Sequence, residues 1–98
     1  MKQDQDIYGR KMMVPETAWS SVEFEDINGT QWKADLNLDV GYEDGTLWVE
    51  LYRWSDDWGL DGDRDDDLCV YPDSCDLDDE EAVIEYLRDY VNEYWSGR

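Results

Sequence analysis

A strict alternation of apolar and polar side chains over residues 31–40 constrains the fold of this chain more than any other feature. Every residue between the apolar positions is polar or charged. A period of two over ten residues is typical of a β-strand with one buried face. The buried positions of this strand are expected to be Trp32, Ala34, Leu36, Leu38 and Val40.

Residues 20–25 predict a strand that precedes it. The turn between the two strands must keep both apolar sets on one face of the sheet. A two-residue loop would cross the faces, whereas a three-residue loop over 27–29 sets Phe24 opposite Trp32. The longer loop also places Gly29 where a left-handed backbone is needed. We therefore expect the three-residue loop.

Residues 46–54 predict a third strand whose core residues, Leu47, Val49 and Leu51, occupy odd positions. An even-length loop is needed to join it to the strand before, and residues 42–45 supply four residues ending in Gly45. This loop pairs residue 41 with residue 46. The expected cross-strand neighbours are Asp39 with Trp48, Asp35 with Tyr52, and Lys33 with Trp54.

The remaining segments complete an α+β fold in a single domain over residues 1–98. We expect an antiparallel meander of three to four strands with one C-terminal helix packed on its apolar face. The apolar run 68–71 is long enough for the fourth, edge strand. The expected order is an N-terminal arm (1–16), a β-meander (18–54), an Asp-rich loop (55–77) and a helix (79–95).

The helix carries its own boundary signals. Asp78 is a suitable N-cap, Glu81 completes a capping-box-like pair, and Leu77 is placed to pack on Ala82. Gly97 is expected to end the helix. Apolar and aromatic side chains form one stripe that should face the sheet. The stripe consists of Val83, Ile84, Leu87, Tyr90, Val91, Tyr94 and Trp95.

Composition indicates a folded domain with an anionic surface. The chain has 27 acidic and eight basic residues and no histidine, which gives a net charge of −19. It also has six tryptophans and seven tyrosines, whereas disordered acidic segments are poor in aromatic residues. Such a surface suits a basic partner, and basic protein surfaces commonly bind nucleic acid phosphates.

The uncovered face of the expected sheet is the candidate binding surface. Acidic residues two apart on a strand lie about 6.7 Å apart, so rows of them can imitate a nucleic acid backbone. Aromatic residues among them can stack against arginine or aromatic side chains of a partner. The candidate partner-binding residues are Glu23, Glu25, Asp35, Asp39, Trp48, Glu50, Tyr52, Trp54, Asp56 and Asp57. The alternative is that these aromatic residues only cover the sheet beneath the 55–77 loop.

Metal binding and catalysis have weaker support. Asp61, Asp63 and Asp65 match the first, third and fifth positions of a calcium-binding EF loop, but Asp66 and Pro72 fail its glycine and glutamate positions. A calcium site of another kind stays open. We expect no cofactor and no metal.

Without histidine, a serine or cysteine nucleophile would lack its usual base, so we expect no enzyme activity. The only cysteines, Cys69 and Cys75, are expected to be reduced thiols. Zinc is not expected, because their spacing is wrong and the chain has no histidine ligand.

In size, charge and interspersed aromatic residues, the chain resembles small acidic DNA-mimic inhibitors of phages and mobile elements. These include anti-restriction, anti-CRISPR and uracil-DNA glycosylase inhibitor proteins. Acidic rows such as Glu23/Glu25 and Asp35/Asp39 carry the resemblance, which covers the whole chain in character and no specific motif. It implies that carboxylates occupy a site meant for phosphates.

We therefore expect a non-catalytic inhibitor of a host defence nuclease complex. Its partner would be a basic nucleic-acid-binding protein, without direct contact to nucleic acid or membrane, and its location the cytoplasm. Three alternatives remain open. The chain is an immunity protein or antitoxin against a nuclease toxin, a domain adapted to high salt, or a calcium-stabilised binding module.

Overall fold

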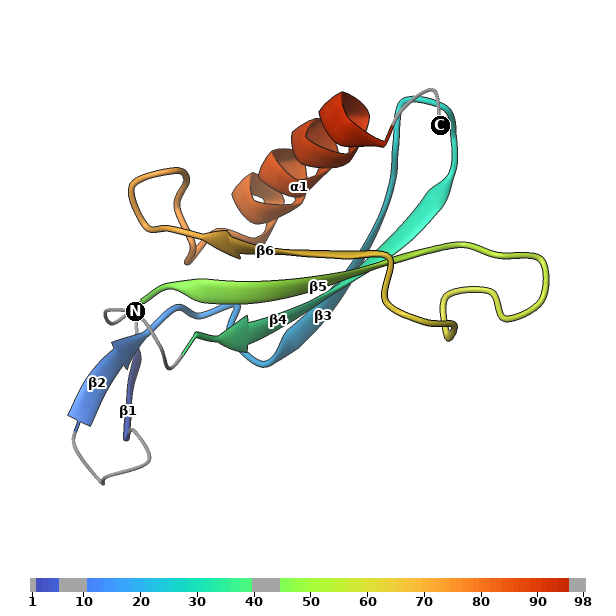
Figure 1. The fold of residues 1–98 in the computed structure, drawn as a ribbon. Helices are drawn as coiled ribbons and strands as arrows, with labels where there is room; N and C mark the ends of the chain where they lie inside the picture. The colour runs from blue at the N-terminus through green and yellow to red at the C-terminus, as the bar shows by residue number, and fades with distance from the viewer. Residues whose placement is uncertain (1, 6–10, 40–44, 96–98) are drawn as a thin grey trace.

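The computed structural model describes residues 2–5, 11–39 and 45–95 of the chain, with side chains from residue 14 onward. It is an α+β fold, as the sequence predicted (Figure 1). The elements are β1 (Lys2–Gln5), β2 (Lys11–Val14), β3 (Ser20–Glu25), β4 (Gln31–Leu38), β5 (Leu47–Arg53), β6 (Asp66–Val70) and α1 (Glu80–Tyr94).

Strands β3 to β6 form an antiparallel meander in chain order, and α1 lies across one face of this sheet (Figure 1). The helix covers the face that carries the alternating apolar residues, so the core lies between them. Val83, Leu87 and Val91 are the fully buried helix residues. The strand residues of this core are Val22, Phe24, Trp32, Ala34, Leu36, Leu38, Leu47, Val49, Leu51 and Val70. Val40, which was expected to join them, lies outside the described residues.

The β3–β4 turn has the predicted three-residue loop. Phe24 pairs with Trp32, and Gly29 has a φ of 80°. The Asp26 carboxylate accepts hydrogen bonds from the backbone N–H groups of Asn28 (2.8 Å) and Thr30 (3.0 Å) and from the Trp32 indole (2.9 Å). Burial raises the pKa of Asp26, but these hydrogen bonds outweigh it and hold the pKa below its ordinary value.

The predicted register between β4 and β5 is wrong by two residues. The Asp39 N–H donates to the Thr46 carbonyl at 3.0 Å, so residue 39 faces residue 46, where the sequence placed residue 41. A shift of two keeps every side chain on its face, so the alternation alone could not detect it. Most of the predicted 42–45 loop lies outside the described residues. The observed neighbours are Lys33 with Tyr52, Asp35 with Glu50, and Asn37 with Trp48.

The Asp-rich segment contains the fourth strand. The sequence suggested an edge strand at residues 68–71. The observed strand β6 begins two residues earlier, at Asp66, and ends at Val70. It pairs with β5 from Leu47↔Val70 to Leu51↔Asp66.

The helix boundaries correct one prediction. Asp79 is the N-cap and accepts from the Glu81 N–H at 3.0 Å. Asp78, predicted as the N-cap, instead accepts from the Glu16 N–H at 2.9 Å and so ties the chain after β2 to the start of α1. Tyr94, expected on the core stripe, is 48% exposed. The predicted stop at Gly97 lies outside the described residues.

The N-terminal arm contains a hairpin that the sequence did not predict. Strands β1 and β2 pair antiparallel from Lys2↔Val14 to Gln5↔Lys11 and project from the main sheet (Figure 1). Val14 itself is fully buried, and the Thr17 hydroxyl donates to the Leu77 carbonyl at 2.7 Å. In the described part of the chain, no helix is long and apolar enough to cross a membrane.

Candidate acidic interaction surface

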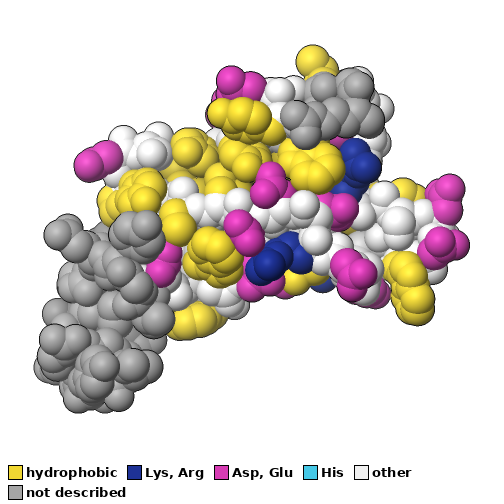
Figure 2. Space-filling model, in the orientation of Figure 1, with side chains coloured by type: hydrophobic (Ala, Val, Ile, Leu, Met, Phe, Trp, Pro, Cys, Tyr) yellow, Lys and Arg dark blue, Asp and Glu magenta, His cyan; other side chains and the backbone are white. Residues whose placement is uncertain are grey.

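The face of the sheet opposite α1 carries six carboxylates. We call these six residues the acidic face. Odd-numbered positions on β3 and β4 and even-numbered positions on β5 point to this side, because alternate strand residues point to opposite faces. Figure 2 shows acidic and hydrophobic side chains intermixed on one side of the molecule. The acidic face consists of Glu23, Glu25, Asp35, Asp39, Glu50 and Asp67.

Three of these carboxylates form a row across neighbouring strands. Asp35 on β4 pairs with Glu50 on β5, and Glu50 pairs with Asp67 on β6. Neighbouring strands lie about 4.8 Å apart, and like charges directly opposite each other destabilise a sheet. We call Asp35, Glu50 and Asp67 the acidic row. Ser21 ends it on β3, and its hydroxyl donates to the Asp35 carboxylate at 2.9 Å.

Arg64 partly compensates the negative charge of the acidic row. Its guanidinium nitrogens lie 3.7 Å from Glu50 and 3.5 Å from Asp67. The side chains of Arg64, Glu50 and Asp67 are 47%, 30% and 38% exposed, so water screens these ion pairs. Exposed pairs of this kind contribute about 0–1 kcal/mol. The row therefore retains a net negative charge.

Tyr52 and Trp48 lie among the acids. The Tyr52 hydroxyl donates to Glu50 at 3.3 Å, and the Lys33 ammonium lies 4.6 Å from the centre of the Tyr52 ring. Burial raises the pKa of Tyr52, and the charges of Glu50 and Asp35 raise it further. Trp48 is half-buried between Asn37 and Cys69 on the neighbouring strands. Trp48 and Tyr52 both lie two positions from Glu50 on β5, on the same face of the sheet.

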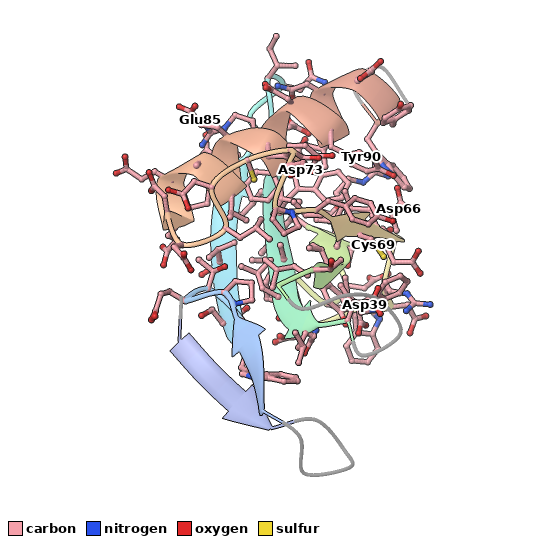
Figure 3. All side chains as sticks on the ribbon, turned by 90° about the vertical axis from the view of Figure 1, so that its left-hand side faces the viewer. Asp39, Asp66, Cys69, Asp73, Glu85 and Tyr90 are labelled. Atoms are coloured by element: carbon pink, nitrogen blue, oxygen red, sulfur yellow. The ribbon has the colours of Figure 1, made fainter. Side chains whose placement is uncertain are left out.

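Asp39 is held at the end of β4 by a thiol. Cys69 Sγ donates to the Asp39 carboxylate at 3.0 Å, and Figure 3 shows the two residues on the same side of the molecule. Burial and this hydrogen bond raise the pKa of Cys69 to about 11. Burial also raises the pKa of Cys75. Cys69 and Cys75 are not joined in a disulfide, and a thiol with a raised pKa is a poor nucleophile at neutral pH.

Glu23 and Glu25 lie at the β3 edge of the acidic face, and both are exposed. Glu23 pairs with Lys33 across β3 and β4. The Glu25 backbone carbonyl accepts a hydrogen bond from the Arg88 Nε–H at 3.1 Å. These two carboxylates extend the acidic face towards solvent.

The last three predicted residues, Trp54, Asp56 and Asp57, do not lie on the sheet. They belong to a loop over residues 54–65, the tryptophan loop, which projects beyond the end of β5 (Figure 1). Trp54 is 53% exposed, and Trp58, which the sequence analysis did not single out, is 69% exposed. The structure thus divides the predicted site into two surfaces.

Sequence reasoning also missed Asp67 and Arg64. The positions of both residues depend on β6. Asp67 reaches the acidic face because β6 pairs with β5, and Arg64 forms an ion pair with Asp67. Over the described residues, no group of three or more acidic or cysteine side chains is arranged to hold a metal ion, Asp61, Asp63 and Asp65 included. Comparisons of the chain with models of protein families, with curated proteins and with solved structures find no match.

Proposed function

We propose that this protein is a non-catalytic inhibitor that imitates the charge of a nucleic acid. It occupies the basic DNA- or RNA-binding site of a host defence nuclease complex, in the manner of anti-restriction and anti-CRISPR proteins. The observation that carries this proposal is the acidic row, three carboxylates paired across three strands with one arginine between two of them.

The acidic row is costly in the isolated protein and favourable against a cationic partner. Carboxylates on adjacent strands repel each other, and the sheet holds them in fixed positions. A surface of lysines and arginines that binds phosphates relieves this repulsion, because it supplies opposite charge at short range. The gain is larger than for flexible acids, since the sheet has already ordered them.

Neighbouring aromatic residues support recognition beyond charge. Tyr52 and Trp48 flank Glu50 on β5 and present partly buried rings on the same face of the sheet. Aromatic residues stack on arginine guanidinium groups and on the aromatic side chains that normally stack on bases. The acidic face and these two aromatic residues together offer the negative charges and the stacking rings that a nucleic-acid site recognises.

Charge reversal tests the proposal with a matched control. D35K/E50K alters the acidic row, whereas E85K/E93K alters exposed acids of α1, and Figure 3 shows Glu85 directed away from the sheet. Both double variants change the net charge from −19 to −15, because each reversal adds two charges. Any difference between them thus reports position and not total charge.

The assay immobilises each protein and exposes it to a nucleic-acid-depleted lysate of the native host cell. We expect wild type and E85K/E93K to retain a nucleic-acid-binding protein that duplex DNA or RNA releases at constant salt. D35K/E50K should bind it about ten-fold or more weakly. Equal losses in both variants, or retention that no polynucleotide can displace, would contradict the proposal.

A further inference from the structure

The tryptophan loop presents a second surface, separate from the acidic face. It exposes two large aromatic side chains, Trp54 and Trp58, at the far end of an elongated molecule of 43 × 25 × 17 Å. Figure 2 shows hydrophobic and acidic side chains side by side at this end. Exposed tryptophans held in one place are typical of binding surfaces, because tryptophan is enriched among the residues that dominate binding energy.

Short backbone hydrogen bonds give this loop a defined shape. Ser55 and Gly59 exchange two of them, at 3.0 and 2.8 Å, and the Ser55 hydroxyl accepts from the Trp58 N–H at 3.2 Å. Gly59 has a φ of 60°, and a Cβ there would lie 3.1 Å from the Trp54 ring. The glycine therefore allows the loop to close against Trp54.

The base of the loop is also fixed. The Asp65 carboxylate accepts from the Arg53 N–H at 2.7 Å, and the Asp65 N–H donates to the Leu51 carbonyl at 2.8 Å. A loop that is already ordered loses little conformational entropy when a partner binds. Its tryptophans are thus presented in a preformed arrangement.

Two adjoining cavities lie between the tryptophans and the acids of the loop. One of about 200 Å³ is lined by Arg53, Trp54, Ser55, Trp58, Gly62, Asp63 and Asp65. The other, of about 280 Å³, is lined by Trp58, Asp61, Gly62 and Asp63. Each is smaller than a typical small-molecule pocket of about 300–1,000 Å³ and suits a single long side chain.

The larger cavity, lined by Trp58, Asp61 and Asp63, favours a cationic side chain. Arg53 borders only the smaller cavity, and its guanidinium lies 5.2 Å from the centre of the Trp95 ring. An indole face attracts a cation, and carboxylates accept hydrogen bonds from its nitrogens. Arginine meets both requirements better than lysine, because its planar guanidinium stacks on aromatic rings and donates in a fixed fork. Of the lining acids, Asp63 has no hydrogen bond or ion pair to any other residue that the structure describes.

We propose that the tryptophan loop binds arginine side chains of a basic protein segment, with the guanidinium on Trp58 and its nitrogens donating to Asp63. This inference draws on the proposed function only in expecting a basic partner. It adds a second contact, specific for arginine, to the acidic face, which attracts either cation.

Labelled nona-arginine and nona-lysine peptides test this specificity in 150 mM salt by fluorescence anisotropy. We expect wild type to bind nona-arginine about five-fold more tightly than nona-lysine. W58A should abolish this preference and leave nona-lysine binding within about two-fold. W19A removes another exposed tryptophan, 56% exposed on the chain before β3, and should keep the preference.

Further variants separate this inference from the proposed function. D63N replaces the carboxylate with an amide of the same shape and should reduce the arginine preference, though less than W58A does. D35K/E50K should weaken both peptides equally and leave the preference intact. Thermal unfolding of each variant checks that it is folded. Equal binding of the two peptides to wild type, or an unchanged preference in W58A, would overturn the inference. So would self-association in sedimentation that W58A abolishes, because the loop would then bind a second copy.

Discussion

At the scale of single residues, Asp66 is the least expected feature of the fold. It lies on the helix side of β6, and its Oδ2 accepts from the Tyr90 hydroxyl at 2.7 Å and the Trp95 indole at 3.0 Å. Figure 3 shows Asp66 and Tyr90 directed toward each other between β6 and α1. The Trp95 ring in turn contacts Trp32 edge-on, with centroids 5.6 Å apart. One carboxylate thus joins the edge strand to the C-terminal half of the helix.

The Tyr90 hydroxyl gives this contact a pH dependence. Burial raises the pKa of Tyr90 to about 12, and the hydrogen bond to Asp66 adds to the effect. In the unfolded chain the tyrosine ionises near its ordinary value of 10.0. Above that pH the unfolded state loses the proton first. The contribution of Tyr90 to stability is therefore complete below pH 10 and is lost as pH rises towards about 12.

Tyr90→Phe tests this contact. It removes the donor to Asp66 and should lower the free energy of unfolding by about 1–2 kcal/mol at pH 7, measured by urea denaturation. The difference from wild type should narrow between pH 10 and 12. The control is Tyr94→Phe, at an exposed tyrosine one turn away. It should change the free energy of unfolding little, both at pH 7 and between pH 10 and 12. A difference that stays constant with pH would show that the hydroxyl does not act through its proton.

Nothing in the local sequence indicated this role for Asp66. It is one of many aspartates between residues 55 and 79, and a run of this kind predicts a solvated loop. Its inward position follows from the pairing of β6 with β5, and its donors lie 24 and 29 residues further along the chain. Long-range partners of this kind cannot be read from local periodicity.

At the scale of elements, apolar alternation and turn geometry determined most of what could be predicted. The faces of β3, β4 and β5 and the β3–β4 loop followed from period and parity. The helical period also identified the buried stripe of α1, except for the exposed Tyr94. The β4–β5 register did not, because a shift of two residues preserves the parity. Asp78 and Asp79 are both suitable caps by residue type, and Asp78 is drawn away from this role by its long-range contact with Glu16.

The β3–β4 turn provides a test at this scale. Gly29 has a φ of 80°, and a Cβ there would meet nothing within 4 Å. Gly29→Ala should therefore destabilise through backbone conformation and not through a clash, by about 1 kcal/mol. For a domain of this size that corresponds to a fall in melting temperature of about 4–8 °C.

Gly29→Asn is the matched control for this turn, because asparagine tolerates the left-handed conformation better than alanine. It should cost clearly less than Gly29→Ala in the same thermal unfolding measurement. Equal melting temperatures for wild type and Gly29→Ala would mean that the loop adopts another conformation. The register of Phe24 with Trp32 would then need another explanation.

At the scale of the whole molecule, the salt dependence of stability distinguishes the proposed inhibitor from a domain adapted to high salt. A net charge of −19 on 11.6 kDa destabilises the compact state through self-repulsion. Salt limits the range of this repulsion, to about 30 Å at 0.01 M and to about 8 Å at 0.15 M. Since the molecule measures 43 × 25 × 17 Å, repulsion acts across its width at the lower salt and only between neighbours at the higher.

We therefore expect most of the salt effect on stability between 0.01 and about 0.15 M, where the screening distance falls below the thinnest dimension, 17 Å. The melting temperature should rise by about 5–10 °C over that range and change little above it. Sodium and potassium chloride should act alike, because screening depends on ionic strength. Micromolar calcium should add nothing beyond screening if no calcium site stabilises the fold.

A cooperative transition in 0.15 M salt is the outcome that the inhibitor requires, because it must be folded where its target binds nucleic acid. A protein adapted to high salt would instead lack that transition and gain it only in molar salt. Repeating the measurement with D35K/E50K relates stability to function. If the acidic row is held against its own repulsion, this variant should melt higher than wild type in 0.01 M salt, and by more than E85K/E93K does. A lower melting temperature would mean that Asp35 and Glu50 stabilise the sheet, and the proposal would lose its physical basis.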